Sequence, residues 1–371
     1  MMQKIATNKI KVLIVDDSAL IRALLKEIIN QADDMEVVGV ASDPIIAREK
    51  IRALQPDVIT LDIEMPNMDG LEFLEKLMRL HPLPVIMVST HTSQGSAATL
   101  RALELGAVDF IAKPKVDIQN KLETYASLIT EKIRIAAEAN VRPMHGTGAS
   151  TSKPAAPKKL SVLEKTMRKK ASPVEKLIVI GASTGGTEAI KELLIRMPID
   201  CPPILVVQHM PEGFTKSYAA RLDSLSEIAV NEAVHGEPIM VGHAYLAPGG
   251  SHFSIIRSGK QYVCRISDDE PVNYHRPSVD VLFNSVAAVV KDNAIGVILT
   301  GMGKDGAAGL KLLHDQGCKT YAQNKASCVV FGMPKEAIER GAADEILPLE
   351  DIAEHILQTL GFAQQNQDYC H

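Results

Sequence analysis

The stretch LIVIGASTGGTEAI, residues 177–190, joins a short apolar run to a glycine-rich turn and the start of a helical pattern. This order predicts a buried strand that turns sharply into a helix, the repeating unit of a parallel α/β sheet. The turn itself, GASTGG, fits three kinds of site: a phosphate loop, a dinucleotide-binding turn or the seat of an exposed serine. The neighbouring chemistry must decide among them.

The residues of the turn favour the serine. A dinucleotide fingerprint needs a glycine where Ser183 stands, and a phosphate loop needs a lysine where Thr187 stands. The pattern GxSxG fits Gly181, Ser183 and Gly185, and it exposes a serine on a tight strand-to-helix turn. A serine that only caps the following helix is the alternative interpretation.

A nucleophilic serine needs a base and an acid that orients the base. The next apolar run, PILVV, leads to His209, and the strand pattern AIGVIL is followed by a glycine-rich turn that carries Asp305. Because the carboxyl ends of parallel strands share one edge of a sheet, Ser183, His209 and Asp305 are expected to meet there. Backbone N–H groups after Ser183 and around Met302 are the expected oxyanion donors.

Chain order tests this expectation. In α/β-hydrolases the acid precedes the histidine, which here requires His314 or His355 as the base. Both of these histidines lie inside helical runs rather than after strands. The sequence therefore disfavours a standard α/β-hydrolase fold.

The first 140 residues alternate short apolar runs with helical patterns. This alternation predicts right-handed βαβ units and a doubly wound parallel sheet. The expected strands are KVLIV (11–15), MEVVGVA (35–41), PDVITL (56–61), PVIMVS (84–89) and VDFIA (108–112).

Polar side chains stand at four of these strand ends: Asp16 and Asp17, Asp62, Ser89, and Lys113. Three carboxylates on one edge repel unless a hard divalent cation lies among them, and oxygen ligands suit Mg²⁺. A carboxylate beside Mg²⁺ can attack a phosphoryl donor while a lysine and a hydroxyl cover the phosphoryl oxygens. Taken singly, a helix cap at Asp17 and a solvated Lys113 are the alternatives.

The amino-acid composition changes between Arg142 and Lys176, a segment with nine basic and two acidic residues and with clustered Pro, Gly and Ser. Such a segment buries too little apolar surface to order itself and is typical of a linker. Its portion LSVLEKTMRKK is also compatible with a short docked helix. We therefore predict a first α/β domain over residues 1–140, a basic flexible linker over 141–175 and a second α/β domain over 176–371.

The composition excludes several classes of protein. The 371 residues are 46% hydrophobic and carry a net charge of -5, which argues against a general nucleic-acid-binding surface. No apolar run approaches the about 20 residues of a membrane helix. The five cysteines show no CxxC spacing, which argues against a disulfide framework or a zinc site. We expect a cytoplasmic protein that neither binds nucleic acid nor inserts into a membrane.

The N-terminal half resembles the receiver domain of two-component response regulators in its motifs VDDS, LDIEMPNMDG, MVST and FIAKP. The resemblance implies a flavodoxin-like fold and a Mg²⁺-dependent phosphorylation site. The implied roles are phosphoacceptor for Asp62, magnesium ligands for Asp16, Asp17, Asp62 and the backbone carbonyl of Glu64, contacts of the phosphoryl group for Ser89 and Lys113, and the aromatic switch for Phe110.

The C-terminal half contains the motifs GASTGGTEA, QHMPEGFTKSYAARLD, YLAPGGSHF, HRPSVDVLF, TGMGKDGAAGL and ASCVVFGMPKEAI. In these motifs it is similar to the catalytic domain of the chemotaxis protein-glutamate methylesterases, the CheB family. The family pairs Ser183 with His209 and Asp305 as a triad and adds Thr184 and Met302 to the active site. It uses no cofactor in this domain.

The two resemblances imply a phosphorylation-activated hydrolase. Its expected reactions are demethylation of glutamyl γ-methyl esters on the cytoplasmic helices of chemoreceptors and deamidation of particular glutamines. A chemotaxis-type histidine kinase is the expected phosphodonor. Three other classes stay open on the residues alone: a regulator with a DNA-binding output, a module that only binds partners, and an esterase of small molecules.

Overall fold

The computed structural model describes residues 9–65, 69–89, 93–113, 122–141 and 174–362. The chain divides into two compact units, Met1–Thr151 and Ser152–His371. The division falls inside the predicted linker, of which residues 142–173 lie outside the described residues. The linker and its bounds therefore stay a prediction.

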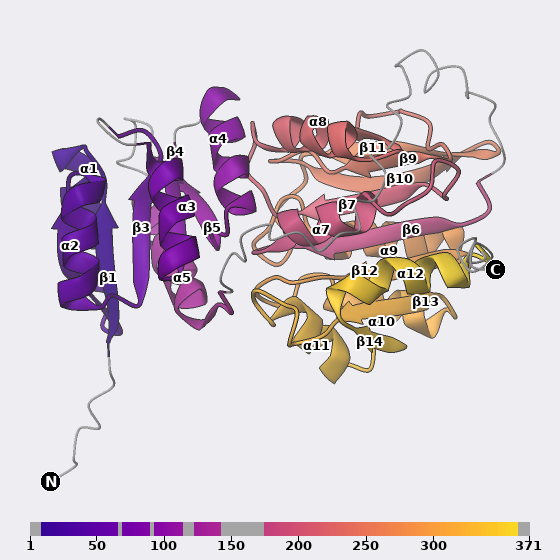
Figure 1. Ribbon diagram of the computed structural model, residues 1–371. Helices are drawn as coiled ribbons and strands as arrows, with labels where there is room; N and C mark the ends of the chain where they lie inside the picture. The colour runs from indigo at the N-terminus through magenta and orange to yellow at the C-terminus, as the bar shows by residue number, and fades with distance from the viewer. Residues whose placement is uncertain (1–8, 66–68, 90–92, 114–121, 142–173, 363–371) are drawn as a thin grey trace, which may run out of the picture. The chain divides into compact units, whose positions relative to one another are not determined.

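The first unit contains a five-stranded parallel sheet with helices on both faces (Figure 1). The strand order is β2-β1-β3-β4-β5, so the direction of winding reverses between β1 and β3. Ligands of such sheets bind outside the carboxyl ends of the strands at this switch point. The strands are β1 (Ile10–Val15), β2 (Met35–Ala41), β3 (Val58–Asp62), β4 (Val85–Ser89) and β5 (Asp109–Ala112).

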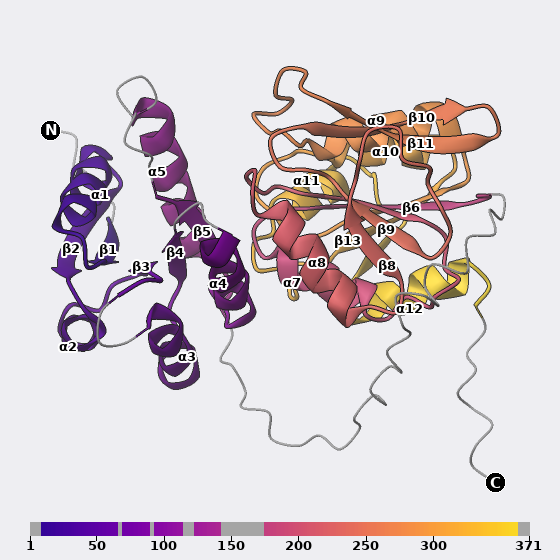
Figure 2. The same ribbon diagram turned by 90° about the horizontal axis from the view of Figure 1, so that it is seen from above.

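The helices of the first unit cover both faces of its sheet. Figure 2 shows α1 and α5 on one face and α2 and α3 on the other, and α4 packs beside α3. Asp43 caps α2 by accepting hydrogen bonds from the amides of Ile45 and Ile46, a local signal for where this helix begins. The helices are α1 (Ala19–Gln31), α2 (Pro44–Leu54), α3 (Gly70–Leu80), α4 (Ser93–Glu104) and α5 (Leu122–Glu138).

The second unit is built on a seven-stranded sheet in the order β14-β13-β12-β6-β7-β9-β8, and every pairing in it is parallel. An antiparallel hairpin, β10 (His252–Ser258) and β11 (Gln261–Ser267), accompanies the sheet. The strands of the sheet are β6 (Leu177–Ala182), β7 (Ile204–Gln208), β8 (Ala229–Glu232), β9 (His243–Leu246), β12 (Ala294–Ile298), β13 (Lys319–Gln323) and β14 (Glu345–Leu347).

Helices cover both faces of this sheet as well. In Figure 2, α7, α8 and α12 lie on one face, and α9, α10 and the hairpin lie on the other. The central strands β6, β7 and β12 are fully buried, as expected for a sheet covered on both sides. The helices are α7 (Gly186–Leu194), α8 (Thr215–Leu225), α9 (Val279–Val290), α10 (Ala307–Asp315), α11 (Met333–Glu339) and α12 (Leu349–Thr359).

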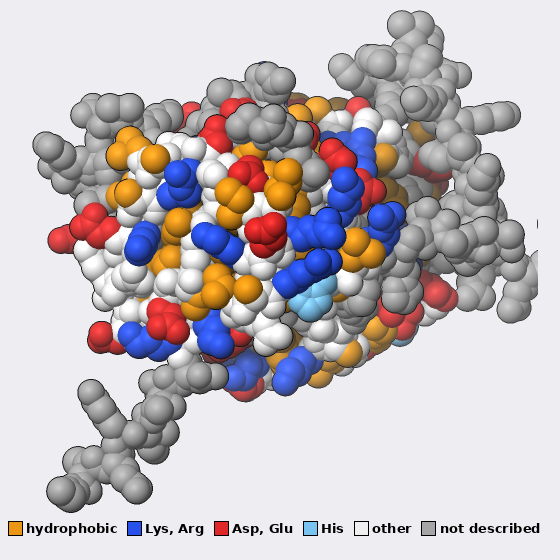
Figure 3. Space-filling model, turned by 60° about the vertical axis from the view of Figure 1, so that its left-hand side comes forward, with side chains coloured by type: hydrophobic (Ala, Val, Ile, Leu, Met, Phe, Trp, Pro, Cys, Tyr) orange, Lys and Arg blue, Asp and Glu red, His pale blue; other side chains and the backbone are white. Residues whose placement is uncertain are grey.

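The face shown in Figure 3 carries side chains of several kinds. In the space-filling view of Figure 3, Lys and Arg side chains are interspersed with Asp, Glu and hydrophobic ones. Among the described helices, none has the length and apolar content that crossing a membrane requires. The predicted fold class, two doubly wound parallel α/β sheets, is confirmed.

Candidate active site and phosphorylation site

Three neighbouring strands of the second unit carry the predicted triad. Ser183 directly follows β6, His209 directly follows β7, and Asp305 lies in the loop after β12. In the register of β6 and β7, Ala182 pairs with Gln208, so Ser183 and His209 occupy the next positions on adjacent strands. The carboxyl edge of a parallel sheet thus collects groups that are far apart in the sequence.

The turn after β6 fixes the backbone of Ser183. The Ser183 amide donates to the carbonyl of Thr300 at 3.0 Å, and its carbonyl accepts from the amide of Gly186 at 2.7 Å. Gly185 has φ +77, a left-handed conformation that favours glycine. At Gly301 a Cβ atom would lie only 2.7 Å from the Cβ of Ser183, so the turn after β12 passes directly against the serine.

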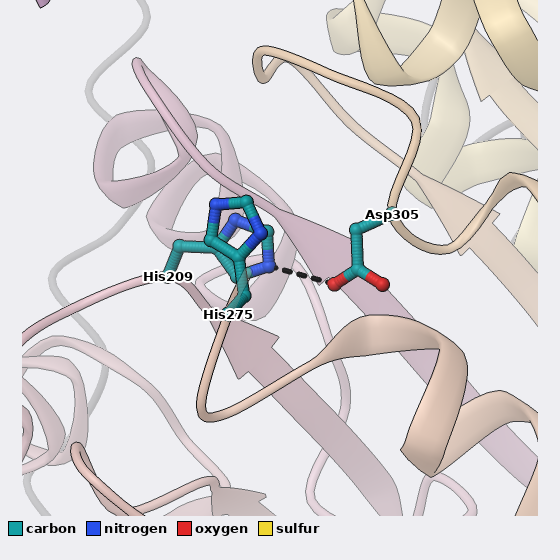
Figure 4. Close-up of side chains that lie close together, drawn as sticks. All are labelled: His209, His275 and Asp305. Atoms are coloured by element: carbon teal, nitrogen blue, oxygen red, sulfur yellow. Dashed lines mark hydrogen bonds and ion pairs between the residues drawn. The ribbon is translucent and has the colours of Figure 1, made fainter. Parts of the chain in front are cut away.

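His209 and Asp305 form a buried pair, with His209 Nε2 2.8 Å from Asp305 Oδ2 (Figure 4). Their side chains are 7% and 1% exposed. An ionised carboxylate only accepts hydrogen bonds, so Nε2 carries the proton and Nδ1 of the neutral ring holds the lone pair. This Nδ1 is buried and has no hydrogen-bond partner among the described residues. Nδ1 is therefore the nitrogen of His209 that is free to accept a proton.

Asp305 accepts hydrogen bonds on both oxygens. Asn273 Nδ2 and Ser278 Oγ donate to Oδ1 at 2.7 and 2.8 Å, and the Val279 amide donates to Oδ2 at 2.6 Å. Burial alone would raise the pKa of this carboxyl, but the hydrogen bonds with His209, Asn273 and Ser278 outweigh burial and hold the pKa well below its usual value. The amide of Val279 belongs to the start of α9, where the helix dipole favours a negative charge.

Thr184 and Met302, the two further residues predicted for this site, lie beside Ser183. Met302 follows Gly301 in the turn that passes against Ser183, and its amide has no acceptor within the described part of the chain. Thr184 is buried, and its carbonyl accepts from Thr300 Oγ1 at 3.0 Å. The Ser183 amide is already bonded to Thr300, so the Met302 amide is the better candidate for stabilising an oxyanion.

In the first unit, Asp16, Asp17 and Asp62 converge at the switch point between β1 and β3. Their carboxylate oxygens lie within 4.8 Å of one another. Lys113 Nζ lies 2.7 Å from Asp62 Oδ2 and 3.2 Å from Asp16 Oδ2. Asp16 and Asp62 are buried, whereas Asp17 is exposed.

The charges of this cluster are not balanced by protein groups alone. Burial raises the pKa of Asp62 to about 6; Lys113 opposes this rise, and Asp16 adds to it. Burial likewise raises the pKa of Asp16. Two buried carboxylates share one ammonium group, and all the converging ligands are oxygens, so the cluster is typical of a Mg²⁺ site.

The other residues predicted for this site lie around the cluster. The Glu64 amide donates to Asp62 Oδ1 at 3.3 Å. Ser89 is buried at the end of β4, where its Oγ accepts from Thr99 Oγ1 at 2.7 Å. Phe110 is buried in β5, with Lys132 Nζ 5.8 Å from the centre of its ring.

Comparison with known proteins decides the family. The chain is 60% identical to a protein-glutamate methylesterase/protein-glutamine glutaminase of Nitrosomonas europaea over 95% of this chain and 97% of that protein. A relative of the same description from Geobacter metallireducens is 59% identical over 94% of this chain and 95% of that protein. This chain belongs to the protein-glutamate methylesterase/protein-glutamine glutaminase family.

Two family models match separate parts of this methylesterase. Residues 178–356 match the CheB methylesterase model, and residues 12–123 match the response regulator receiver domain. Among solved structures, the Thermotoga maritima CheB methylesterase catalytic domain is 43% identical, covering 50% of this chain and 98% of that chain with a TM-score of 0.49. The predicted family and class of enzyme are confirmed, while the roles of individual residues stay predictions.

The methylesterase unit contains residues at the site that the sequence patterns did not predict. Gln208 Nε2 donates to the carbonyls of Ser183 and His209 at 2.8 and 3.2 Å, so one amide ties the two strand ends together. His275 stacks on the ring of His209 (Figure 4). His275 is the first residue of the motif HRPSVDVLF and Asn273 lies two positions before it, but only the fold brings these residues to His209 and Asp305.

Proposed function

We propose that the second unit hydrolyses glutamyl γ-methyl esters on the cytoplasmic helices of chemoreceptors, with Ser183 as nucleophile, His209 as base and Asp305 as orienting acid. The observation that carries this proposal is the His209–Asp305 pair. Its Nε2 is bonded to the carboxylate, while its buried Nδ1 has no partner among the described residues and lies at the strand end adjacent to Ser183.

The reaction follows from these positions. His209 Nδ1 takes the proton of the Ser183 hydroxyl as the oxygen attacks the ester carbonyl, and the negative charge of Asp305 stabilises the imidazolium. The oxyanion accepts a hydrogen bond from the Met302 amide, with Thr184 supplying a second amide at the start of α7. His209 then gives the proton to the leaving methoxide, which departs as methanol. Water, activated by the same nitrogen, cleaves the acyl-enzyme, which releases the glutamyl carboxylate of the receptor and restores the Ser183 hydroxyl.

The same site serves the second reaction. A glutamine side chain differs from the methyl ester only in its leaving group, so attack by Ser183 and protonation by His209 release ammonia in place of methanol. The product of both reactions is a glutamyl carboxylate. The names of the relatives combine these two activities, which supports a single site for both.

We propose further that Asp62 is phosphorylated by a chemotaxis-type histidine kinase. Mg²⁺ would be held by Asp16, Asp17, Asp62 and the backbone carbonyl of Glu64, and when bound it neutralises the carboxylates and the phosphoryl oxygens. Asp62 attacks the phosphorus of the donor, whose bond to phosphorus breaks, and Lys113 and Ser89 bind the phosphoryl oxygens. The buried acidic cluster and its ion pairs with Lys113 support this assignment.

Phosphorylation of Asp62 is proposed to raise the rate of ester hydrolysis by releasing the restraint that the unphosphorylated first unit imposes. Phe110 is the proposed aromatic that changes orientation with the phosphorylation state. The domain content supports this regulation, because a receiver domain shares one chain with the hydrolase.

The direct test measures methanol release from methyl-labelled chemoreceptor membranes. Wild type, Ser183→Ala and a control, Ser254→Ala in the β10–β11 hairpin, are compared with and without Mg²⁺ and a small phosphodonor. We expect release by wild type and by Ser254→Ala, stimulation by the phosphodonor, and none by Ser183→Ala. Equal release by Ser183→Ala and wild type would refute the assignment of the nucleophile.

The regulatory proposal has its own test. Asp62→Asn should retain the basal rate of ester hydrolysis and should lose the response to the phosphodonor. If Asp62→Asn responds as strongly as wild type, another residue accepts the phosphoryl group, and the proposed role of Asp62 is wrong.

A further inference from the structure

A tight turn beside the triad has an unusual backbone. Val272 and His275 exchange backbone hydrogen bonds of 3.1 and 2.9 Å, and the two residues between them, Asn273 and Tyr274, have φ +53 and +65. Two-residue turns of this kind favour Asn followed by Gly, because both positions are left-handed. A tyrosine at the second position is sterically costly, and such residues persist where their surroundings hold them for a function.

Two side chains of this turn contact Asp305 and His209. Asn273 Nδ2 donates to Asp305 Oδ1 at 2.7 Å and to Asp280 Oδ2 at 2.8 Å. The ring of His275 lies parallel to that of His209, with 3.7 Å between the ring centres and 10° between the planes (Figure 4). One short turn therefore contacts both members of the His209–Asp305 pair.

His275 is itself held in place by the turn. Its Nδ1 donates to the backbone carbonyl of Asn273 at 2.6 Å, which fixes the direction of the ring. The side chain of Tyr274 between them is fully exposed. The turn thus has an inner side, formed by Asn273 and His275, that faces the triad.

A metal ion is an alternative explanation for this cluster, because one possible ligand atom from each of His209, His275 and Asp305 lies within 4.8 Å of the others. The lone pairs of imidazole nitrogens lie in the ring planes, and two parallel rings stacked 3.7 Å apart cannot both aim lone pairs at one ion. His209 Nε2 is, in addition, already bonded to Asp305. The arrangement is that of a stack rather than a metal centre.

We propose that His275 is a positioning residue for His209. Its ring covers one face of the catalytic imidazole and opposes the tilting or flipping that would take Nε2 away from Asp305 and Nδ1 away from Ser183. The inference rests on the proposed function, because it concerns the same triad. It predicts that the flat aromatic surface of His275 is what supports His209, while the Nδ1 hydrogen bond to Asn273 only helps to hold that surface in place.

The test compares His275→Ala, which removes the stack, with His275→Phe, which keeps an aromatic ring. The control is His243→Ala. His243 also contacts a carbonyl two residues earlier through Nδ1, at 3.1 Å from Val241 O, but lies on β9 away from the triad. Two readouts are used on the full chain: kcat and KM of methanol release from methylated receptor, and the low-field proton NMR signal of His209 Nε2–H, assigned by its loss in His209→Gln.

His275→Ala is expected to lower kcat about 10- to 100-fold with an unchanged KM, because small misplacements of a catalytic group have effects of this size. The Nε2–H signal should broaden or disappear. His275→Phe should restore the greater part of both readouts, and His243→Ala should leave them as in wild type. Circular dichroism and thermal unfolding establish that each variant is folded.

Three outcomes would overturn the proposal. His275→Ala could keep both kcat and the Nε2–H signal. His275→Phe could be folded yet as impaired as His275→Ala, which would assign the role to the ring nitrogens. KM could rise with kcat unchanged, which would assign His275 to substrate binding. If wild type released no methanol, the proposed function would fail, while the NMR comparison would still decide whether His275 holds the ring of His209.

Discussion

Replacing Asp305 with asparagine is expected to reverse the tautomer of His209. An asparagine side chain has the shape of aspartate but presents an NH₂ group in place of one oxygen. In wild type, Oδ2 accepts from His209 Nε2 and the Val279 amide, and Oδ1 accepts from Asn273, Ser278 and, at 3.3 Å, the Asp280 amide. The orientation of the new amide decides which of these bonds survive.

The contacts predict that orientation. With NH₂ at the Oδ2 position, only the Val279 amide loses its acceptor, because His209 can accept from NH₂ after its proton moves to Nδ1. With NH₂ at the Oδ1 position, the Asn273 side chain and the Asp280 amide both lose the oxygen to which they donate. The Ser278 hydroxyl keeps its hydrogen bond, because it can accept from NH₂ instead of donating. The first arrangement is better by about one hydrogen bond, roughly 1 kcal/mol or a fivefold preference.

The favoured arrangement has no base. A proton on Nδ1 occupies the nitrogen that must accept the Ser183 proton, and the negative charge that stabilises the imidazolium is also gone. A fivefold preference leaves about one molecule in six with the productive tautomer, so the tautomer accounts for about a sixfold loss and the missing negative charge for the remainder. Together we expect kcat for methanol release to fall by about 10³- to 10⁴-fold, the size of effect seen when the aspartate of a Ser-His-Asp triad is replaced with asparagine. In the NMR spectrum, the low-field signal of His209 Nε2–H should disappear.

The matched control is Asp280→Asn. Asp280 is also buried and also accepts from Asn273, but it bonds to the Gly309 amide rather than to His209. Its variant should stay within about tenfold of wild type, because the tautomer of His209 is unaffected. An Asp305→Asn enzyme within tenfold of wild type, or an Asp280→Asn enzyme that is equally impaired, would refute the reasoning.

Three further predictions concern other contacts. Gln208→Leu removes the amide that binds the carbonyls of Ser183 and His209, and kcat should fall about 10- to 100-fold in the methanol assay, with wild-type activity as the contradicting result. The pKa of Asp305 is lower in the folded chain than in the unfolded one. The ionised carboxylate therefore stabilises the folded chain fully above about pH 4, and this contribution is lost as the pH falls further. Urea unfolding should therefore show that the free energies of unfolding of wild type and Asp305→Asn approach each other as the pH falls below about 4. A difference between these two free energies that does not change with pH would contradict this prediction. Chelation of Mg²⁺ by EDTA should abolish phosphorylation of Asp62 and leave basal methanol release unchanged, whereas loss of basal release would place a metal in the hydrolase.

The sequence predicts the parts of the site that depend on strand ends. Ser183, His209 and the acidic cluster around Asp62 each stand where an apolar run stops, and the carboxyl edge of a parallel sheet brings such positions together. The convergence of these positions depends only on where the strands end and on the parallel topology, so it can be predicted from the sequence. It does not indicate which nitrogen of His209 faces Asp305.

The residues that contact the His209–Asp305 pair and the carbonyl of Ser183 could not be predicted from the sequence in this way. Asn273 is separated from Asp305 by 32 positions, and His275 from His209 by 66. Neither residue ends a strand, and the left-handed backbone of Asn273 and Tyr274 lacks the glycine that normally signals such a turn. The contact of Gln208 with two carbonyls likewise depends on the register of β6 and β7.

The strand order explains why Asp305 needs so many supports. Strand β6, which leads to Ser183, lies between β12 and β7, so Asp305 and His209 follow strands that are not neighbours. Two strand spacings amount to about 10 Å, more than an aspartate directly at the end of β12 can span. Asp305 instead lies seven positions beyond the end of that strand, in a loop that crosses in front of Ser183. A loop of this length does not fix a side chain, and the start of α9 together with Asn273 therefore supplies the rigidity that the strand cannot.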